Sequence, residues 1–280
     1  MSRSRLEALA YRMLGSVADA EDVLQEARLR RLKLDSPPDN EEAWMVRVVT
    51  NLAVDRLREQ KRRREAYAGP WLPEPLPTGA PEQVAELAEQ LGIGLMLMLE
   101  RLSPAERAVF VLRDGFDLGF ADIGAMLDAS AAACRQRYRR ARAHLAAEVH
   151  EPRVSDTPGE QRALLEALLA AVAERDIEAL VGLFAEDCIA YTDGGGVVSA
   201  AIVPVTEPAR IAQVTLHIAA RLEREGRLEF RFTELNGGPG LLVRQDDVLI
   251  ATLQLEVAAG LIRRLYVVRN PQKLAHLVSP

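Results

Sequence analysis

A proline-rich stretch at residues 68–81, AGPWLPEPLPTGAP, constrains the fold of this 280-residue chain more than any other segment. Proline has no backbone N–H and a fixed φ, so five prolines in fourteen residues exclude a helix or a central strand. We interpret the stretch as a linker, and the chain length suits about two or three domains. A plain spacer needs no large apolar side chains, so we expect Trp71 and Leu72 to dock on a neighbouring domain.

Three helices are predicted before the linker. Two lie within residues 3–35 and are separated at Gly15-Ser16, and the third covers residues 41–65. Acidic residues in the first turn of the second helix favour the helix dipole. The third helix has one apolar face and ends in a basic cluster that could neutralise several phosphates, formed by Arg56, Arg58, Lys61, Arg62, Arg63 and Arg64.

Helical patterning resumes after the linker, over residues 82–149. The sequence LSPAER at 102–107 places Ser103, Pro104 and Glu106 at the N-cap, N1 and N3 positions of a new helix. Residues 121–145 read as two helices joined by a tight turn at 128–130, which is the pattern of a helix-turn-helix. The second of these helices carries arginines away from its apolar face and is a candidate DNA-reading helix. An ordinary solvated basic helix has the same pattern.

The remainder, after a polar connector at 150–159, has mixed patterning. We predict a helix pair over 160–185 and a helix over 208–224. Strand-like runs occupy 188–192, 197–205 and 228–235, and a closing hairpin uses 247–258 and 260–270. The pattern predicts an α+β domain with a curved, mostly antiparallel sheet.

Composition narrows the class of protein. A net charge of −6 argues against non-specific coating of nucleic acid, although the basic helices leave local DNA binding open. The two cysteines, Cys134 and Cys188, lie far apart and suit a reduced, cytoplasmic interior. Four scattered histidines and the lack of a CxxC pair predict no metal site. We find no signal peptide or membrane span in the sequence, and we expect no cofactor and no membrane partner.

Residues 1–149 resemble the extracytoplasmic-function (ECF) sigma factors of bacterial RNA polymerase. The matching segments are YRMLGSVADAEDVLQEA, AWMVRVVTNLAVDRLREQKRR, LSPAERAVFVLRD and the helix-turn-helix. WLPEP in the linker, DGGG at 193–196 and NPQKL at 270–274 resemble the sigma-J-like subgroup, whose C-terminal extension is a SnoaL-like domain acting as a built-in regulator. The resemblance implies core RNA polymerase and promoter DNA as partners.

The resemblance also implies a fold and its boundaries. Two all-α domains are expected, a sigma region 2 bundle at 1–67 and a sigma region 4 helix-turn-helix at 82–149, joined by the linker 68–81. The connector 150–159 leads to a cone-shaped α+β SnoaL-like (cystatin/NTF2-like) domain at 160–280. Two departures from the family pattern are Asp128, where a turn glycine is usual, and Gln272, where aspartate is usual.

Site residues follow from the same resemblance, position by position. The surface for the polymerase clamp matches Asp19, Glu21, Asp22, Gln25 and Glu26. The minus-ten element is expected to be read by Asn51 and held by Arg56, Arg58 and Arg62. The minus-thirty-five element is expected to meet Arg135, Gln136, Arg139 and Arg140 in the major groove, with Arg142 on phosphate. Regulation between domains is expected to use Trp71, Leu72, Pro73, Asp193, Gly194, Gly195, Gly196, Asn270 and Pro271.

Two other functions remain open. SnoaL-like folds include cyclases, and Tyr191, Asp193 and His217 could supply acid–base chemistry in an apolar cone. Asp193 precedes three glycines, as in a turn, and His217 stands alone on a helix, so we favour a non-catalytic regulator. A one-component DNA-binding regulator that senses a small molecule is the alternative outside the sigma factors. An anti-sigma factor or a small-molecule ligand also remains open as a further partner.

Overall fold

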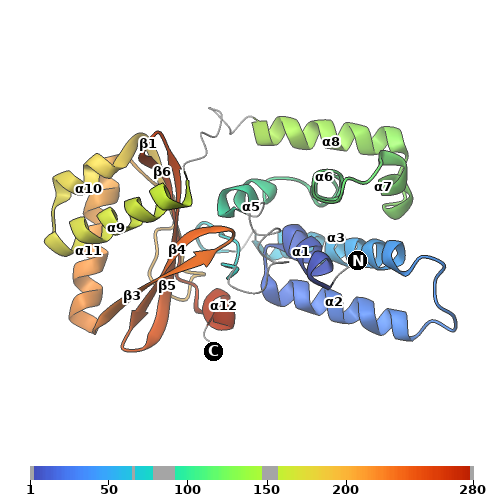
Figure 1. Cartoon of the computed structure of the whole chain (residues 1–280), viewed down its shortest axis with the longest axis horizontal. Coiled ribbons are helices and arrows are strands. Elements are labelled where there is room, and N and C mark those ends of the chain that lie inside the picture. Colours follow the sequence, from blue (N-terminus) through green and yellow to red (C-terminus); the bar gives the residue numbers. More distant parts are fainter. Residues whose placement is uncertain (1–2, 65–66, 78–91, 147–156, 278–280) are drawn as a thin grey trace. The chain divides into compact units, whose positions relative to one another are not determined.

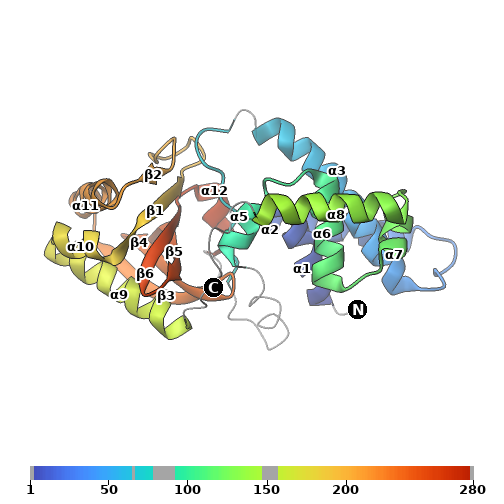
Figure 2. The same ribbon diagram turned by 90° about the horizontal axis from the view of Figure 1, so that it is seen from above.

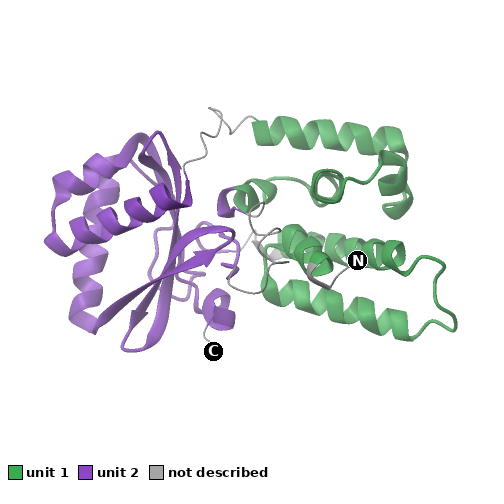
Figure 3. Ribbon diagram, in the orientation of Figure 1, with its two compact units in different colours: residues 1–66, 95–152 green, residues 67–94, 153–280 purple. Residues whose placement is uncertain are grey.

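The computed structural model describes residues 3–64, 67–77, 92–146 and 157–277 of the chain. They form two compact units (Figure 3). Unit 1 combines residues 1–66 with 95–152, and unit 2 combines residues 67–94 with 153–280. The proline-rich segment therefore belongs to the same unit as the C-terminal domain.

The first half of unit 1 is a bundle of α1 (Arg3–Leu14), α2 (Val17–Leu32) and α3 (Glu41–Arg64), as the sequence predicts (Figure 1). Gly15 has a φ of 66°, and Ser16 caps α2 by accepting a hydrogen bond from the Asp19 N–H at 3.1 Å. Leu9, Met13, Leu24 and Val49 are among the buried core residues of the three helices. The side chains of Arg63 and Arg64 lie outside the described residues.

The second half of unit 1 contains α5 (Ile93–Leu99) from Leu95 onwards, α6 (Pro104–Phe116), α7 (Phe120–Met126) and α8 (Ala131–Ala146). The expected capping box of Ser103 and Glu106 is present, with proline in the first turn of α6. Residues 82–91, where we expect the first helix of this segment to begin, lie outside the described part of the chain. Helix α6 also packs on α1, because the buried Arg107 donates from Nε to the Arg12 carbonyl at 3.0 Å.

The turn between α7 and α8 is tight without a glycine at 128. Asp128 adopts a left-handed φ of 51°, a conformation that aspartate tolerates better than most residues. Glycine is required instead at position 124, because a Cβ on Gly124 would lie 2.4 Å from the Ala129 carbonyl oxygen. Ser130 then caps α8 through the Ala133 N–H at 3.1 Å.

Unit 2 is an α+β domain. Helices α9 (Pro158–Glu174), α10 (Ile177–Leu183) and α11 (Pro208–Glu225) cover one face of a six-stranded sheet (Figure 2). The sheet order is β2-β1-β6-β5-β4-β3, with only β1 and β6 parallel to each other. The strands are β1 (Phe184–Asp193), β2 (Val205–Thr206), β3 (Leu228–Leu235), β4 (Gly238–Gln245), β5 (Val248–Ala258) and β6 (Leu261–Val268). The chain continues into α12 (Pro271–Leu274) and a short 3-10 helix at Ala275–Leu277.

Two strand predictions need correction. The run at 197–205 was expected to be a strand, but only Val205–Thr206 pairs with β1. Gly194 to Val198 instead form a turn, because Gly195 and Gly196 take positive φ and redirect the chain. Strand β4 was missed, since its first residues, Gly238-Pro239-Gly240, hide the alternation, although its central residues Leu241 and Val243 are buried.

Candidate functional site: a docked linker and two basic helices

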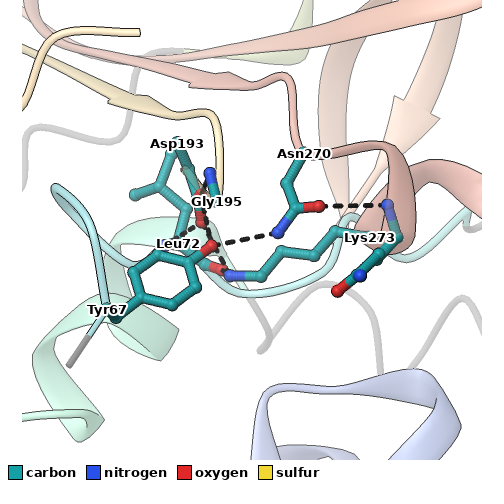
Figure 4. Close-up of polar contacts among 7 residues, drawn as sticks. Tyr67, Leu72, Asp193, Gly195, Asn270 and Lys273 are labelled. Atoms are coloured by element: carbon teal, nitrogen blue, oxygen red, sulfur yellow. Dashed lines mark hydrogen bonds and ion pairs between the residues drawn. The ribbon is translucent and has the colours of Figure 1, made fainter. Parts of the chain in front are cut away.

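Asp193 is the centre of a buried polar site in unit 2. It ends β1 and is 0% exposed. Its Oδ1 accepts from the Tyr67 hydroxyl and from the Gly195 N–H, the latter at 3.0 Å. Its Oδ2 accepts from the Leu72 N–H at 2.8 Å and from Lys273 Nζ at 2.7 Å (Figure 4). Four donors therefore solvate a carboxylate that water does not reach, which is what a buried charge requires.

Lys273 neutralises this carboxylate and also hydrogen-bonds to the linker backbone. The side chain of Lys273, 5% exposed, donates to the Leu72 carbonyl as well as to Asp193. Its ammonium lies 3.8 Å from the centre of the Trp71 ring, a cation–π contact within the favourable range. The aromatic ring, the backbone of Leu72 and the carboxylate together surround a single cation.

Asn270 braces the site from the start of α12. Its Oδ1 accepts the Gln272 N–H at 3.0 Å, and its Nδ2 donates to the Tyr67 hydroxyl at 3.1 Å. A Cβ on Gly195 would lie 2.2 Å from that amide nitrogen, and Gly195 has a φ of 63°, so both space and backbone require glycine. At Gly194 a Cβ would lie 2.3 Å from the Val198 carbonyl oxygen.

The rest of the linker is held along unit 2. Leu72 is fully buried and Pro73 is buried. Asn236 exchanges two hydrogen bonds with Leu76, donating its N–H at 2.7 Å and accepting at its side chain at 3.2 Å. The His276 ring lies 2.7 Å from the Pro75 carbonyl oxygen. Residues 67–77 are thus a docked segment of unit 2.

The predicted regulatory residues are therefore brought together, with two additions. Leu72, Asp193, Gly195 and Asn270 share one network, and Pro271 begins α12 beside it. Sequence reasoning did not select Tyr67 or Lys273. The available signal was that Lys273 is one of only three lysines in the chain and lies inside the NPQKL motif.

Helix α8 presents the predicted DNA-reading residues to solvent. Arg135, Gln136, Arg139, Arg140 and Arg142 are all exposed, while Cys134 and Ala141 are buried. Tyr138 anchors the helix, because its ring contacts Phe110 and Phe120 and its hydroxyl donates to Asp114 at 2.6 Å. Burial raises the pKa of Tyr138, so the hydroxyl keeps its proton and remains a donor. Two of the five already have partners, since Arg140 lies 3.3 Å from Glu106 and the Arg142 guanidinium lies 6.0 Å from the centre of the Tyr138 ring.

Helices α2 and α3 carry the other predicted sets. Glu21, Asp22, Gln25 and Glu26 are exposed on α2 and Asp19 is half-buried; Asn51, Arg58 and Arg62 are exposed on α3. Arg58 pairs within α3, with Asp55 at 2.8 Å. Arg56 instead pairs with the neighbouring helix, because its guanidinium lies 3.3 Å from Asp19 and 3.1 Å from Asp22 of α2. It therefore links the acidic set to the basic set. These helices also flank a hollow of about 200 Å³ lined by Asp22, Val23, Glu26, Leu52, Asp55, Arg56 and Glu59.

Comparison with known proteins agrees with this arrangement. Residues 1–63 match the family model for sigma-70 region 2, and residues 94–145 match the model for sigma-70 region 4. The chain is 37% identical to the ECF RNA polymerase sigma factor SigJ of Mycobacterium tuberculosis over 223 residues, which cover 78% of this chain and 71% of SigJ. The chain belongs to the ECF sigma factors.

Other relatives extend the likeness to the whole sigma factor. The probable ECF sigma factor SigI of Mycobacterium tuberculosis is 29% identical over 97% of this chain and 92% of SigI. The crystal structure of Mycobacterium tuberculosis SigJ matches 99% of this chain and 96% of its own with a TM-score of 0.78 at 29% identity. The expected fold class, two helical sigma regions followed by a SnoaL-like α+β domain, is confirmed.

The core of unit 2 is apolar. Its cluster of buried side chains includes Leu165, Leu168, Leu180, Ile211 and Leu265.

The three residues considered for acid–base chemistry lie in three different environments. Asp193 is committed to the linker, and His217 is exposed on α11. Tyr191 stacks on Tyr266 at 5.7 Å between ring centres. Across the part of the chain that the structure describes, no three His, Cys, Asp or Glu side chains gather as a metal site would need. No helix among the described residues is long and apolar enough to cross a membrane.

Proposed function

We propose that this sigma factor binds core RNA polymerase through the acidic face of α2 and reads its promoter with α3 and α8. The main support for the DNA-reading role is that the inner face of α8 is packed and its opposite face presents exposed arginines. We assign Arg135, Gln136 and Arg139 to base edges of the minus-thirty-five element and Arg142 to phosphate. Arg140, already paired with Glu106, is the member that can contribute least to base reading.

The minus-ten set is proposed in a modified form. Asn51, Arg58 and Arg62 remain the DNA-contacting residues, since each is exposed on α3. Arg56 is better described as a positioning residue, because two carboxylates of α2 hold its guanidinium. It then sets the distance between the polymerase-binding helix and the DNA-binding helix without touching a base.

The C-terminal domain is proposed to modulate promoter use in cis through the linker. The chain from α3 to α5 passes through residues 67–77, which the Asp193–Lys273 site holds in unit 2. Fixing these residues shortens the free tether between the two DNA-reading helices, and a shorter tether changes the effective concentration of one reader at its element once the other is bound. This proposal requires no catalysis, and it assigns the protein to the cytoplasm, where RNA polymerase works.

A reconstituted transcription assay tests the proposal. Core RNA polymerase with this chain should initiate at a cognate promoter, and core enzyme alone should not. Arg139→Ala should reduce initiation, whereas Arg210→Ala, an exposed arginine on α11, should not.

The same assay separates the alternatives. A one-component regulator would shift promoter DNA without core enzyme and would not support initiation. If Asp193→Asn leaves initiation unchanged on promoters of every spacing, the linker role is wrong even where the sigma activity stands.

A further inference from the structure

Strand β3 forms one edge of the sheet in unit 2, and its outer side has an exposed aromatic residue between opposite charges. Glu229, Phe230 and Arg231 are exposed, and Phe230 retains 46% of its surface. Only the end of β3 has a described partner there, through the isolated bridge between Leu235 and Pro77. The edge strand of a sheet can accept a further strand unless something prevents it.

The turn between β3 and β4 shows which backbone groups point outwards along this edge. Leu235 pairs with Gly238 across a two-residue turn at Asn236 and Gly237, both of which have positive φ. The residues that flank such a turn hydrogen-bond to each other, so the backbone groups of Leu235 face β4. Direction alternates with every residue, and β3 pairs with β4 without a bulge from Leu228 to Leu235. The outward N–H and C=O groups therefore belong to even-numbered residues, namely Leu228, Phe230, Phe232 and Glu234.

This alternation limits how two copies of β3 could pair about a twofold axis. If the twofold axis passed between two residues, each even-numbered residue would lie opposite an odd-numbered one. The outward N–H and C=O groups of one copy would then have no partner in the other, so the axis must pass through a residue. An axis at Arg231 or at Glu229 places like charges face to face. An axis at Phe232 requires Leu235, which the linker already occupies.

An axis at Leu228 would pair only the first three residues of β3, whereas an axis at Phe230 avoids these conflicts and uses most of the strand. Phe230 then faces Phe230 of the second copy as a hydrogen-bonded pair, with Leu228 opposite Phe232 of the second copy. Glu229 faces Arg231 of the second copy, and this complementary contact occurs twice. Glu229 also lies 3.1 Å from Arg227 in its own chain, and Arg227 meets the neutral Thr233 of the second copy.

We propose that the outer edge of β3 is a homodimerisation surface, in which two chains pair antiparallel about Phe230 to continue the sheet from one copy into the other. Charges on an edge usually prevent pairing, but here they select a single register. The interface is short compared with that of a stable dimer, so association is weak and depends on protein concentration.

Sedimentation velocity on the full chain, from micromolar to submillimolar concentration, tests the proposal. The parent should shift from monomer to dimer, and salt should weaken the dimer. Glu229→Arg and Arg231→Glu should each weaken dimerisation by about tenfold or more, because each creates two like-charge contacts. The double variant should recover the dimer.

The most stringent test mixes the two single variants. Glu229→Arg chains mixed with Arg231→Glu chains should form heterodimers although neither variant pairs with itself. Phe230→Lys, which sets like charges at the axis, should also be monomeric, and Arg210→Glu on α11 is the matched control that should behave as the parent. Circular dichroism verifies that each variant is folded.

A parent that stays monomeric throughout the range would overturn the proposal. Single variants that dimerise like the parent, or a mixture that stays monomeric, would do the same. None of these results depends on promoter activity, so the dimer and the proposed sigma function fail separately.

Discussion

Replacement of Lys273 by methionine is the sharpest single perturbation of the docked linker. Methionine keeps an unbranched apolar side chain but removes the ammonium that pairs with the fully buried Asp193. Breaking a buried ion pair from one side costs roughly 3–5 kcal/mol. Tyr67, Leu72 and Gly195 still donate to the carboxylate, so we expect the lower end, about 3 kcal/mol.

That loss corresponds to a large shift in thermal unfolding. For a unit of this size 1 kcal/mol moves Tm by about 2–4 °C, so unit 2 should melt roughly 6–12 °C lower. The readout is Trp71 fluorescence in a Trp44→Phe background, where Trp71 is the sole tryptophan. Loss of its contact with Lys273 should also shift its emission to longer wavelength in the folded protein.

A double-mutant cycle with Asp193→Asn isolates the pair. Removing both charges should cost less than the sum of the single changes by at least about 1 kcal/mol, because neither partner is left as an uncompensated charge. Lys61→Met, on the exposed part of α3, is the control for loss of a lysine. If Lys273→Met unfolds within about 1 kcal/mol of the parent and Trp71 emission is unchanged, the ion pair does not hold the linker.

Three further outcomes are expected. Gly195→Ala should destabilise unit 2 by roughly 1–3 kcal/mol in denaturant titrations, since the new Cβ meets Asn270 and the φ of 63° is strained for alanine; an unchanged midpoint contradicts the argument. Arg139→Ala should lose roughly 1–3 kcal/mol of discrimination at one base pair, measured with promoter variants, and equal losses on all sequences would make it a phosphate contact. Burial raises the pKa of Cys188 to about 12, so at pH 8 its thiol should react with iodoacetamide only after unfolding; rapid labelling of the native chain would refute this.

Much of the helical part could be predicted because its determinants are local. Ser103, Pro104 and Glu106 define a helix start within four residues, and the structure confirms it. The inward and outward faces of α8 follow from a period of 3.6 residues, and the exposure of its arginines agrees. Strand β4 escaped prediction because its Gly-Pro-Gly start disrupts alternation, and only pairing with β3 and β5 makes it a strand.

The docking of the linker was predicted, but the ion pair at its centre was not. The expectation that Trp71 and Leu72 dock on a neighbouring domain came from the observation that a spacer has no use for large apolar groups, and the resemblance to the sigma-J-like subgroup pointed to residues 193–196. That Lys273 neutralises Asp193 could not be predicted, because a contact across 80 residues of sequence leaves no periodic signal. The same holds for Arg56, which looked like a phosphate contact until α2 supplied two carboxylates.

The amino-acid sequence alone determined the order of the parts: three helices, a proline-rich break, a helix-turn-helix and an α+β domain. Each depends on hydrogen bonds and periodicities that span a few residues. Only the tertiary structure decided how the break docks on unit 2, with Tyr67, Asp193 and Lys273 around its backbone. A buried charge is stable only where its partners converge in three dimensions, and that convergence is a property of the folded chain.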